Sequence, residues 1–304
     1  MLAWLLAALT SRALAARTCD VVAVCGARAD NATNAAPFLS ACVAAGGPCS
    51  APNSTLLFPA GAHFLSGSID LSNSVNLTLS FSEGAALFGS GDPALFPLQP
   101  ALPPTNMPQF AQQWAALIYA RNVTGLTLEG PPSAVIDGLG WPWWRAFANG
   151  SLAHQRPKLV EVVDGQRITF RGLTIRNSPF WTLHTLYSRD VQFLGLTITA
   201  PRSVGNTDGI DPDSCSDVVI ADCVIDVGDD GISLKSDFRV DPRTGDVTLL
   251  PTERVVRCYP PRLRARLRKP PRLSVVTPQR PRAPRPSPHP RSSATPPCCG
   301  ATLQ

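Results

Sequence analysis

Two stretches of the sequence, Thr207-Asp208-Gly209-Ile210-Asp211-Pro212-Asp213-Ser214 and Asp229-Asp230-Gly231-Ile232-Ser233-Leu234-Lys235-Ser236, repeat one pattern. Its Asp-Gly-Ile core recurs after 22 residues, since 230 − 208 = 22. If 22 residues form one coil of a parallel β-solenoid, Asp230 lies above Asp208 at the roughly 4.8 Å spacing of neighbouring strands, with Asp229 beside them. The repeat therefore predicts three carboxylates side by side.

Three carboxylates at this distance have a chemical consequence. Like charges repel, so one of the three is expected to keep its proton near neutral pH, and a protonated acid beside ionised carboxylates suits general acid/base hydrolysis. Two alternatives stay open: a solvated run of turn aspartates, and a calcium site built from Asp208, Asp211, Asp213, Asp229 and Asp230. Asp211 and Asp213 point elsewhere if Asp208 faces a cleft, so we expect no metal and no cofactor.

A short β-rich segment recurs before this repeat and between its two copies, at Arg121–Leu128, Arg167–Ile175, Asp190–Ile198 and Asp217–Ile225. Self-similarity at a period of twenty-odd residues indicates stacked repeats. Apolar and polar residues alternate within each copy, which is typical of strands with one buried face and excludes helical solenoids. The copies also lack the Leu-x-x-Leu-x-Leu frame of leucine-rich repeats. We therefore predict an all-β fold, a right-handed parallel β-helix that spans Thr55–Val256.

A solenoid must close its ends, because an open coil exposes unpaired strand edges and core side chains. The stretch Asn34–Ala45 carries apolar residues at i, i+1, i+4 and i+5, starts near a capping Asn and stops at Gly46-Gly47. This pattern predicts a short amphipathic helix. We expect it to cap the N-terminal end of the β-helix.

The residues around the acids resemble the signature of a known family. Asn206-Thr207-Asp208-Gly209, followed by Gly228-Asp229-Asp230, is similar to the first two motifs of glycoside hydrolase family 28, the polygalacturonases and related pectin hydrolases. Further stretches resemble the family in the same order, from about Cys19 to Cys258: Phe58-Pro59-Ala60-Gly61 with Leu65 to Ile69, Val135-Ile136-Asp137-Gly138 with Trp141 to Trp144, and Asn177 to His184.

The resemblance implies hydrolysis of α-1,4-galacturonan or a related pectic chain, with inversion at the anomeric carbon. Carried over residue by residue, Asp229 is the general acid, while Asp208 and Asp230 position and deprotonate the attacking water. Asn206 lies at the edge of the site, and a plain turn Asn is the equal alternative. Inverting hydrolases hold acid and base carboxyls roughly 6.5–9.5 Å apart and retaining enzymes near 5 Å, so the spacing tests this scheme.

The chain departs from the family pattern after the paired aspartates. The Gly-His-Gly and Arg-Ile-Lys motifs that would follow are absent, and Arg156-Pro157-Lys158 lies upstream of the acids. A polyanionic substrate needs cations, so Lys235 and Arg202 are candidate substrate contacts, together with His184 from the coil before the acids. Because the expected cationic motifs are missing, we expect the chain as given, a C-terminally truncated member of the family, to be a weak or inactive hydrolase.

The alternative function is that of a non-catalytic β-helix that binds polysaccharide. Trp141, Trp143, Trp144 and Trp181 would then supply stacking platforms, whereas packing in the core or at coil edges is the competing interpretation. Under either function the expected partner is a pectic polysaccharide, galacturonan or rhamnogalacturonan, and the protein is expected to be a monomer.

Residues 259–304 differ from the rest of the chain. They contain ten basic residues, twelve prolines and no Asp or Glu, which leaves 27 − 10 = 17 Lys and Arg against 22 acids in residues 1–258. Proline lacks the donor that a strand ladder needs, and the stretch has little apolar content, so we predict a disordered tail that cannot join the ladder. A basic tail suits nucleic acid, anionic membrane or acidic polysaccharide. We favour the alternative that it is not a native reading frame, and expect neither nucleic acid nor membrane as a partner.

The N-terminus predicts export. Residues 1–16 form a short apolar run that ends in Ala13-Leu14-Ala15-Ala16, as in a secretory signal peptide, so residues 17–258 form the predicted partial β-helix domain. Five glycosylation sequons, at Asn31, Asn53, Asn76, Asn122 and Asn149, and nine cysteines suit a secreted, cell-wall location. Cys42–Cys49 and Cys215–Cys223 are two pairs of consecutive cysteines in the sequence, but spacing alone leaves the pairing open.

Overall fold

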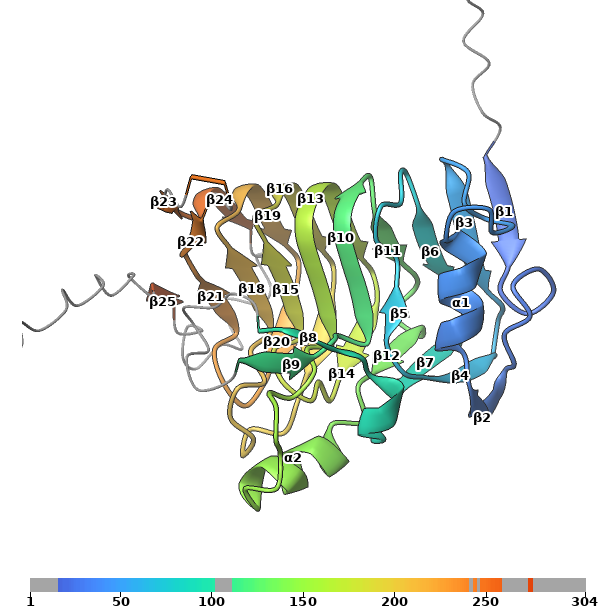
Figure 1. Cartoon of the computed structure of the whole chain (residues 1–304), viewed down its shortest axis with the longest axis horizontal. Coiled ribbons are helices and arrows are strands. Elements are labelled where there is room, and N and C mark those ends of the chain that lie inside the picture. Colours follow the sequence, from blue (N-terminus) through green and yellow to red (C-terminus); the bar gives the residue numbers. More distant parts are fainter. Residues whose placement is uncertain (1–15, 102–110, 241–242, 245–246, 259–272, 276–304) are drawn as a thin grey trace, which may run out of the picture.

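The structure, a computed structural model, describes residues 16–101, 111–240, 243–244, 247–258 and 273–275 of the 304-residue chain. The predicted signal peptide lies outside the described residues except for Ala16. Most of the described strands stack in parallel along the long axis of the molecule, and together they form three faces (Figure 1). The fold is a parallel β-helix, as the repeats predicted.

The first face is the one that carries the acids. It contains β5 (Ile69–Asp70), β10 (Ile118–Thr124), β13 (Val160–Arg171), β15 (Leu183–Leu186), β18 (Ile210–Asp213), β21 (Ile232–Leu234) and β25 (Leu273–Val275).

The second face shares β13, whose second half continues into it. It contains β1 (Arg17–Asp20), β3 (Ser54–Phe58), β6 (Thr78–Phe81), β11 (Thr127–Glu129), β13, β16 (Arg189–Leu194), β19 (Ser216–Ala221) and β24 (Glu253–Cys258). The third face contains β2 (Asp30–Asn34), β4 (His63–Ser66), β7 (Ala86–Gly89), β12 (Val135–Asp137), β14 (Thr174–Arg176), β17 (Thr197–Thr199) and β20 (Val224–Asp226).

The register of the strands agrees with the sequence repeats. Ile168 pairs with Val191, and Val191 pairs with Val218 one coil further on. Equivalent side chains therefore stack in the core, for example the parallel rings of Phe170 and Phe193, whose centroids lie 5.1 Å apart. The parallel ladder starts earlier than the predicted Thr55, because β1 already pairs with β3.

The predicted N-terminal helix is present as α1 (Ala36–Val43), two residues shorter at each end than expected. Asn34 stays outside the helix, and its side-chain Oδ1 accepts hydrogen bonds from the N–H groups of Ala36 and Gly67 at 3.1 and 2.8 Å. The helix packs beside β5, where Ser40 Oγ accepts a hydrogen bond from the Asp70 N–H at 2.9 Å. Leu39 is buried in the core cluster, so α1 covers the start of the first face.

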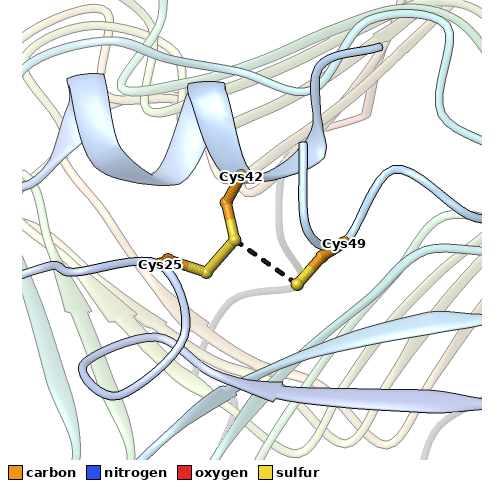
Figure 2. A group of neighbouring side chains, drawn as sticks. All are labelled: Cys25, Cys42 and Cys49. Carbon is orange, nitrogen blue, oxygen red and sulfur yellow. Dashed lines mark hydrogen bonds between the residues drawn. A yellow bond between two sulfur atoms is a disulfide. The ribbon is translucent and has the colours of Figure 1, made fainter. Parts of the chain in front are cut away.

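Two disulfides fasten this N-terminal end. They join Cys19 to Cys49 and Cys25 to Cys42. Figure 2 shows Cys49 beside the bridge between Cys25 and Cys42, and the sulfur atoms of Cys42 and Cys49, which belong to different bridges, are 3.4 Å apart. Cys42 and Cys49, consecutive cysteines in the sequence, are thus not partners. Cys215 and Cys223, the second neighbouring pair, are both free thiols.

Several elements lie outside the three faces. They are the 3-10 helix η1 (Pro93–Leu95), the antiparallel pair β8 (Leu98–Pro100) and β9 (Gln112–Trp114), helix α2 (Trp141–Ala148), and the antiparallel pair β22 (Asp237–Val240) and β23 (Val247–Leu250). Neither α1 nor α2, the two α-helices of the described part, approaches the length and apolarity needed to cross a membrane.

The tail contributes one element to the ladder. The prediction that residues 259–304 stay out of it is wrong for β25, whose three residues pair in parallel with β21. Leu273–Val275 contains no proline, so each residue keeps the backbone donor that a ladder requires. The rest of the tail, on which its predicted disorder depends, lies outside the described residues.

Candidate active site

Three carboxylates come together where two neighbouring coils enter the first face. Asp208 precedes β18, and Asp229 and Asp230 precede β21. The N–H of Gly209 donates to the Asp230 carbonyl oxygen at 3.0 Å, and Ile210 pairs with Ile232, so the two coils are in the 22-residue register of the sequence repeat. One carboxylate oxygen from each acid lies within 4.8 Å of those of the other two.

This distance bears on the stereochemical expectation. The 4.8 Å limit joins one oxygen atom from each acid, whereas the roughly 6.5–9.5 Å of inverting hydrolases and the ~5 Å of retaining enzymes separate whole carboxyl groups. The limit therefore assigns the site to neither class.

Asp208 is the buried member of the trio. It is 5% exposed, and Lys235 Nζ donates to its Oδ2 at 3.3 Å. Burial raises the pKa of Asp208, the charge of Lys235 opposes that rise, and the neighbouring carboxylate of Asp229 adds to it. Within the described residues the second oxygen, Oδ1, is buried and accepts no hydrogen bond. Asp208 therefore has one oxygen fixed by a cation and one that is free for a small polar partner.

Lys235, predicted as a substrate contact, lies inside the site with only 4% of its surface exposed. Its Nζ also donates to Asp211 Oδ1 at 2.7 Å and to Ser233 Oγ at 2.8 Å, and lies 4.3 Å from the centre of the Trp181 ring. Burial alone would lower the pKa of Lys235, but Asp211 and Asp208 outweigh burial and raise it. The ammonium therefore stays charged and holds the two buried carboxylates.

Asn206 connects two charged groups at the edge of the trio. Its N–H donates to Asp229 Oδ2 at 2.7 Å, and its side-chain Oδ1 accepts from Arg156 Nη2 at 2.9 Å. The residue has φ of 61°, a left-handed conformation that asparagine tolerates better than most residues. Asn206 is thus more than a turn residue, since it links the exposed Asp229 to a buried cation.

Arg156 is the residue that sequence reasoning missed. Its side chain is 1% exposed, Nη1 donates to the Pro179 carbonyl oxygen at 3.0 Å, and the guanidinium lies 4.1 Å from the centre of the Phe147 ring. Burial lowers the pKa of Arg156 to about 10, against the opposing charge of Asp208. Arg156 lies in the sequence Arg156-Pro157-Lys158, upstream of the acids, and the stacking of the coils brings its side chain to Asn206.

His184 and Glu161 form a buried network next to the site. His184 is fully buried, with Nδ1 3.2 Å from Glu161 Oε1 and Nε2 3.5 Å from Asp213 Oδ2. Burial would raise the pKa of Glu161, but Lys158 Nζ at 2.5 Å and His184 together lower it to about 2. In this structure His184, predicted as a substrate contact, has no surface that a substrate can reach.

Arg202 is on the open side of the acids. Its side chain is 80% exposed, and Nε donates to Asp226 Oδ1 at 2.7 Å. Arg202 borders an open pocket of about 410 Å³ whose other lining residues run from Ile225 to Gly231 and include Asp229 and Asp230. Of the predicted cations, Arg202 is the one that a ligand in this pocket reaches.

The tryptophans predicted as stacking platforms differ in how far they are exposed. Trp143 and Trp181 are 1% and 7% exposed and pack in hydrophobic clusters, and Trp144 is half-buried, whereas Trp141 is 63% exposed. The stacking-platform interpretation is therefore confined to Trp141. The five-residue calcium arrangement does not form, because Asp211 pairs with Lys235 and Asp213 lies against His184.

Comparisons with known proteins agree with this geometry. Residues 50–242 match the family model described as Glycosyl hydrolases family 28. A probable polygalacturonase of Vitis vinifera is 38% identical over 183 residues, which are 60% of this chain and 36% of the relative. The chain thus spans about a third of that relative's length.

Solved structures share the fold. An exopolygalacturonase from Thermotoga maritima superposes with a TM-score of 0.63 at 23% identity, over 80% of this chain and 59% of that one. A polygalacturonase from Erwinia carotovora superposes with a TM-score of 0.61 at 20% identity, over 82% and 64%. At these identities the likeness establishes the β-helix and no more.

Proposed function

We propose that this chain, which belongs to glycosyl hydrolase family 28, hydrolyses α-1,4-galacturonosyl bonds of a pectic polysaccharide. The observation that carries the proposal is the trio of Asp208, Asp229 and Asp230, with oxygens within 4.8 Å and one member buried beside Lys235. Carboxylates in unequal environments supply an acid and a base at one pH.

The division of roles between these acids follows the family resemblance. Asp229 is exposed beside the pocket, so it can reach a glycosidic oxygen and give it a proton as the bond to the leaving sugar breaks. Asp208, with Asp230, takes a proton from the water that attacks the anomeric carbon. A raised pKa makes Asp208 a stronger base, and Lys235 helps to keep it ionised.

The stereochemical course is the finer part of the proposal. The family resemblance implies inversion, and we propose it for this chain. Proton NMR of the first products decides the question. A product that keeps the α-configuration before mutarotation would overturn the inverting scheme.

The setting proposed for this reaction is outside the cell, in the cell wall, with the protein acting as a monomer. Two disulfides in the described residues are consistent with an oxidising compartment. Pectic polysaccharide is the expected partner.

The proposal is tested by replacing the acids. Asp229→Asn and Asp208→Asn should each lower the release of reducing ends from polygalacturonic acid by roughly 10²–10⁴-fold, because an amide neither donates nor accepts the transferred proton. Asp190→Asn is the matched control, since Asp190 is an exposed residue of β16 with φ of 56°, a left-handed conformation that asparagine also tolerates. Unchanged turnover in either acid variant contradicts the roles. Retention on insoluble pectin without any release by the wild-type protein would favour the non-catalytic alternative.

A further inference from the structure

Two coils before the acids are longer than the three coils that follow them. Along the first face, paired residues are 118 − 69 = 49 and 160 − 118 = 42 positions apart, but only 183 − 160 = 23, 210 − 183 = 27 and 232 − 210 = 22 in the next three coils. The extra residues of the first long coil include η1 and the pair β8 and β9, and those of the second include α2. Both insertions lie on the N-terminal side of the acids.

The β8–β9 insertion covers the first face. Figure 1 shows the two strands running crosswise to β13 and β15. Gln99 on β8 and Gln113 on β9 both donate to Glu161 Oε2 at 3.0 Å, and Gln113 Oε1 accepts from Lys158 Nζ at 3.2 Å. Glu161 lies between the core residues of β13 and therefore points outward, yet it is fully buried. The outer surface of this coil is sealed by the insertion.

The position beside Asp208 is sealed in the same way. The Thr182 N–H donates to the Asp208 carbonyl oxygen at 2.8 Å, so Trp181 stands one coil before Asp208. Trp181 is 7% exposed and packs with Phe180 and with Ala101, which follows β8.

The α2 insertion covers the residues next to Asn206, at the edge of the acids. Trp144 of this helix donates from its indole N–H to the Ser178 carbonyl oxygen at 3.1 Å, and the ring of Phe147 covers the guanidinium of Arg156. Arg156 in turn holds Asn206, which borders Asp229.

Along the strands that follow the acids, the outer surface of these two coils is also closed. The outward side chains that follow Asp208 on these two coils, Asp211 and Lys235, are 0% and 4% exposed. By contrast, Asp229 is exposed and borders the pocket of about 410 Å³ that residues 225–231 line. A sugar chain that reaches the acids from this pocket meets buried side chains beyond them.

We propose that η1, β8 and β9, together with the insertion Trp141–Ala148, make this a site for the end of a galacturonan chain, and that the chain interior does not fit. The reason is steric: cleavage inside a polymer needs accessible surface on both sides of the scissile bond, whereas here one side is filled by Trp181, Lys158 and Glu161. The inference rests on the proposed function, since it assumes galacturonan as the ligand.

Stoichiometry of binding tests the inference without requiring turnover. The full chain with Asp229→Asn is mixed with polygalacturonate fractions of increasing, known mean length, and sedimentation velocity counts the protein molecules bound to each polymer. About 1 M salt, where the Debye length is roughly 3 Å, suppresses contacts of the basic tail with the polyanion. A site for chain ends gives one protein per polymer at every length. Several proteins per polymer, in a number that rises with length, overturn the inference and leave the proposed function standing.

A neutral polymer separates the two hypotheses. Binding to polygalacturonate no stronger than to dextran overturns the proposed function and the inference together. A second measurement uses wild-type protein that shows turnover. Release from a chain end gives one short product while the viscosity of the solution hardly changes, and a fast fall in viscosity with mixed oligomers contradicts it.

Discussion

Lys235→Met is the substitution that probes most directly how the acids are held. The ammonium donates to Asp208 at 3.3 Å and Asp211 at 2.7 Å, and both carboxylates are at least nine-tenths buried. Methionine has a similar length and volume but no charge. The variant therefore leaves two buried carboxylates without their cation while largely keeping the packing against Trp181.

The expected cost follows from that burial. Removing one partner of a buried ion pair costs about 3–5 kcal/mol, because the remaining charge is left uncompensated. The cost depends on pH. Burial holds the pKa values of Asp208 and Asp211 above the ordinary Asp value, and removing Lys235 raises them further. A folded state that binds more protons than the unfolded chain loses stability as pH rises, so the variant is penalised at pH 7 and much less near pH 4.

Two assays check this reasoning. Urea unfolding of wild type and Lys235→Met at pH 7 and pH 4 should give a difference in unfolding free energy of about 3–5 kcal/mol that shrinks at the lower pH. In the pH profile of kcat, the acid limb should move to higher pH, because Asp208 must be ionised to act as a base. An unfolding difference independent of pH, or an acid limb that moves to lower pH, would refute the electrostatic account. Lys235→Arg, which keeps the charge, is the control.

Two further substitutions address the neighbouring contacts. Arg156→Lys keeps the charge but loses the planar guanidinium that reaches Asn206. In steady-state assays kcat should therefore fall, with KM little changed. The control is Arg145→Lys, on the exposed side of α2, which should leave both constants unchanged. Glu161→Gln should cost about 3–5 kcal/mol of unfolding free energy at pH 7, since Lys158 loses its buried counter-ion. The pKa of Glu161 is lowered to about 2, so this difference should fade as pH drops from about 4.5 to 2, and a difference that persists there contradicts the ion-pair origin.

The sequence predicts the register of this fold well because the register is a local property. Each coil repeats an alternation of apolar and polar residues, and the phase of that alternation fixes which residues stack, as for Ile168, Val191 and Val218. The juxtaposition of Asp208 with Asp230 follows from the same register. These features need no knowledge of how the rest of the chain is placed.

The partners of the acids are set by placement in three dimensions, which the repeat does not encode. Lys235 was expected to face the substrate, but it turns to Asp208 and Asp211, since a buried carboxylate is costly without a cation. Arg156 precedes the acids by about two coils in sequence and still reaches Asn206. Disulfide pairing shows the same limit, because Cys19–Cys49 and Cys25–Cys42 follow from the path of the first coil and not from spacing.

Closure of the first face and the basicity of Asp208 have one physical origin, because the side chains that seal the face also exclude water from that carboxylate. Trp181 stands beside Asp208 and against Lys235, so Trp181→Ala should hydrate both. Burial is the main cause that raises the pKa of Asp208, and hydration should therefore lower that pKa. The acid limb of kcat then moves to lower pH, opposite to the shift expected for Lys235→Met. Removal of the ring also exposes surface beyond the acids. In the same variant, the number of protein molecules bound per polymer should therefore begin to rise with polymer length. A variant that alters one property without the other would show that closure and basicity are set independently.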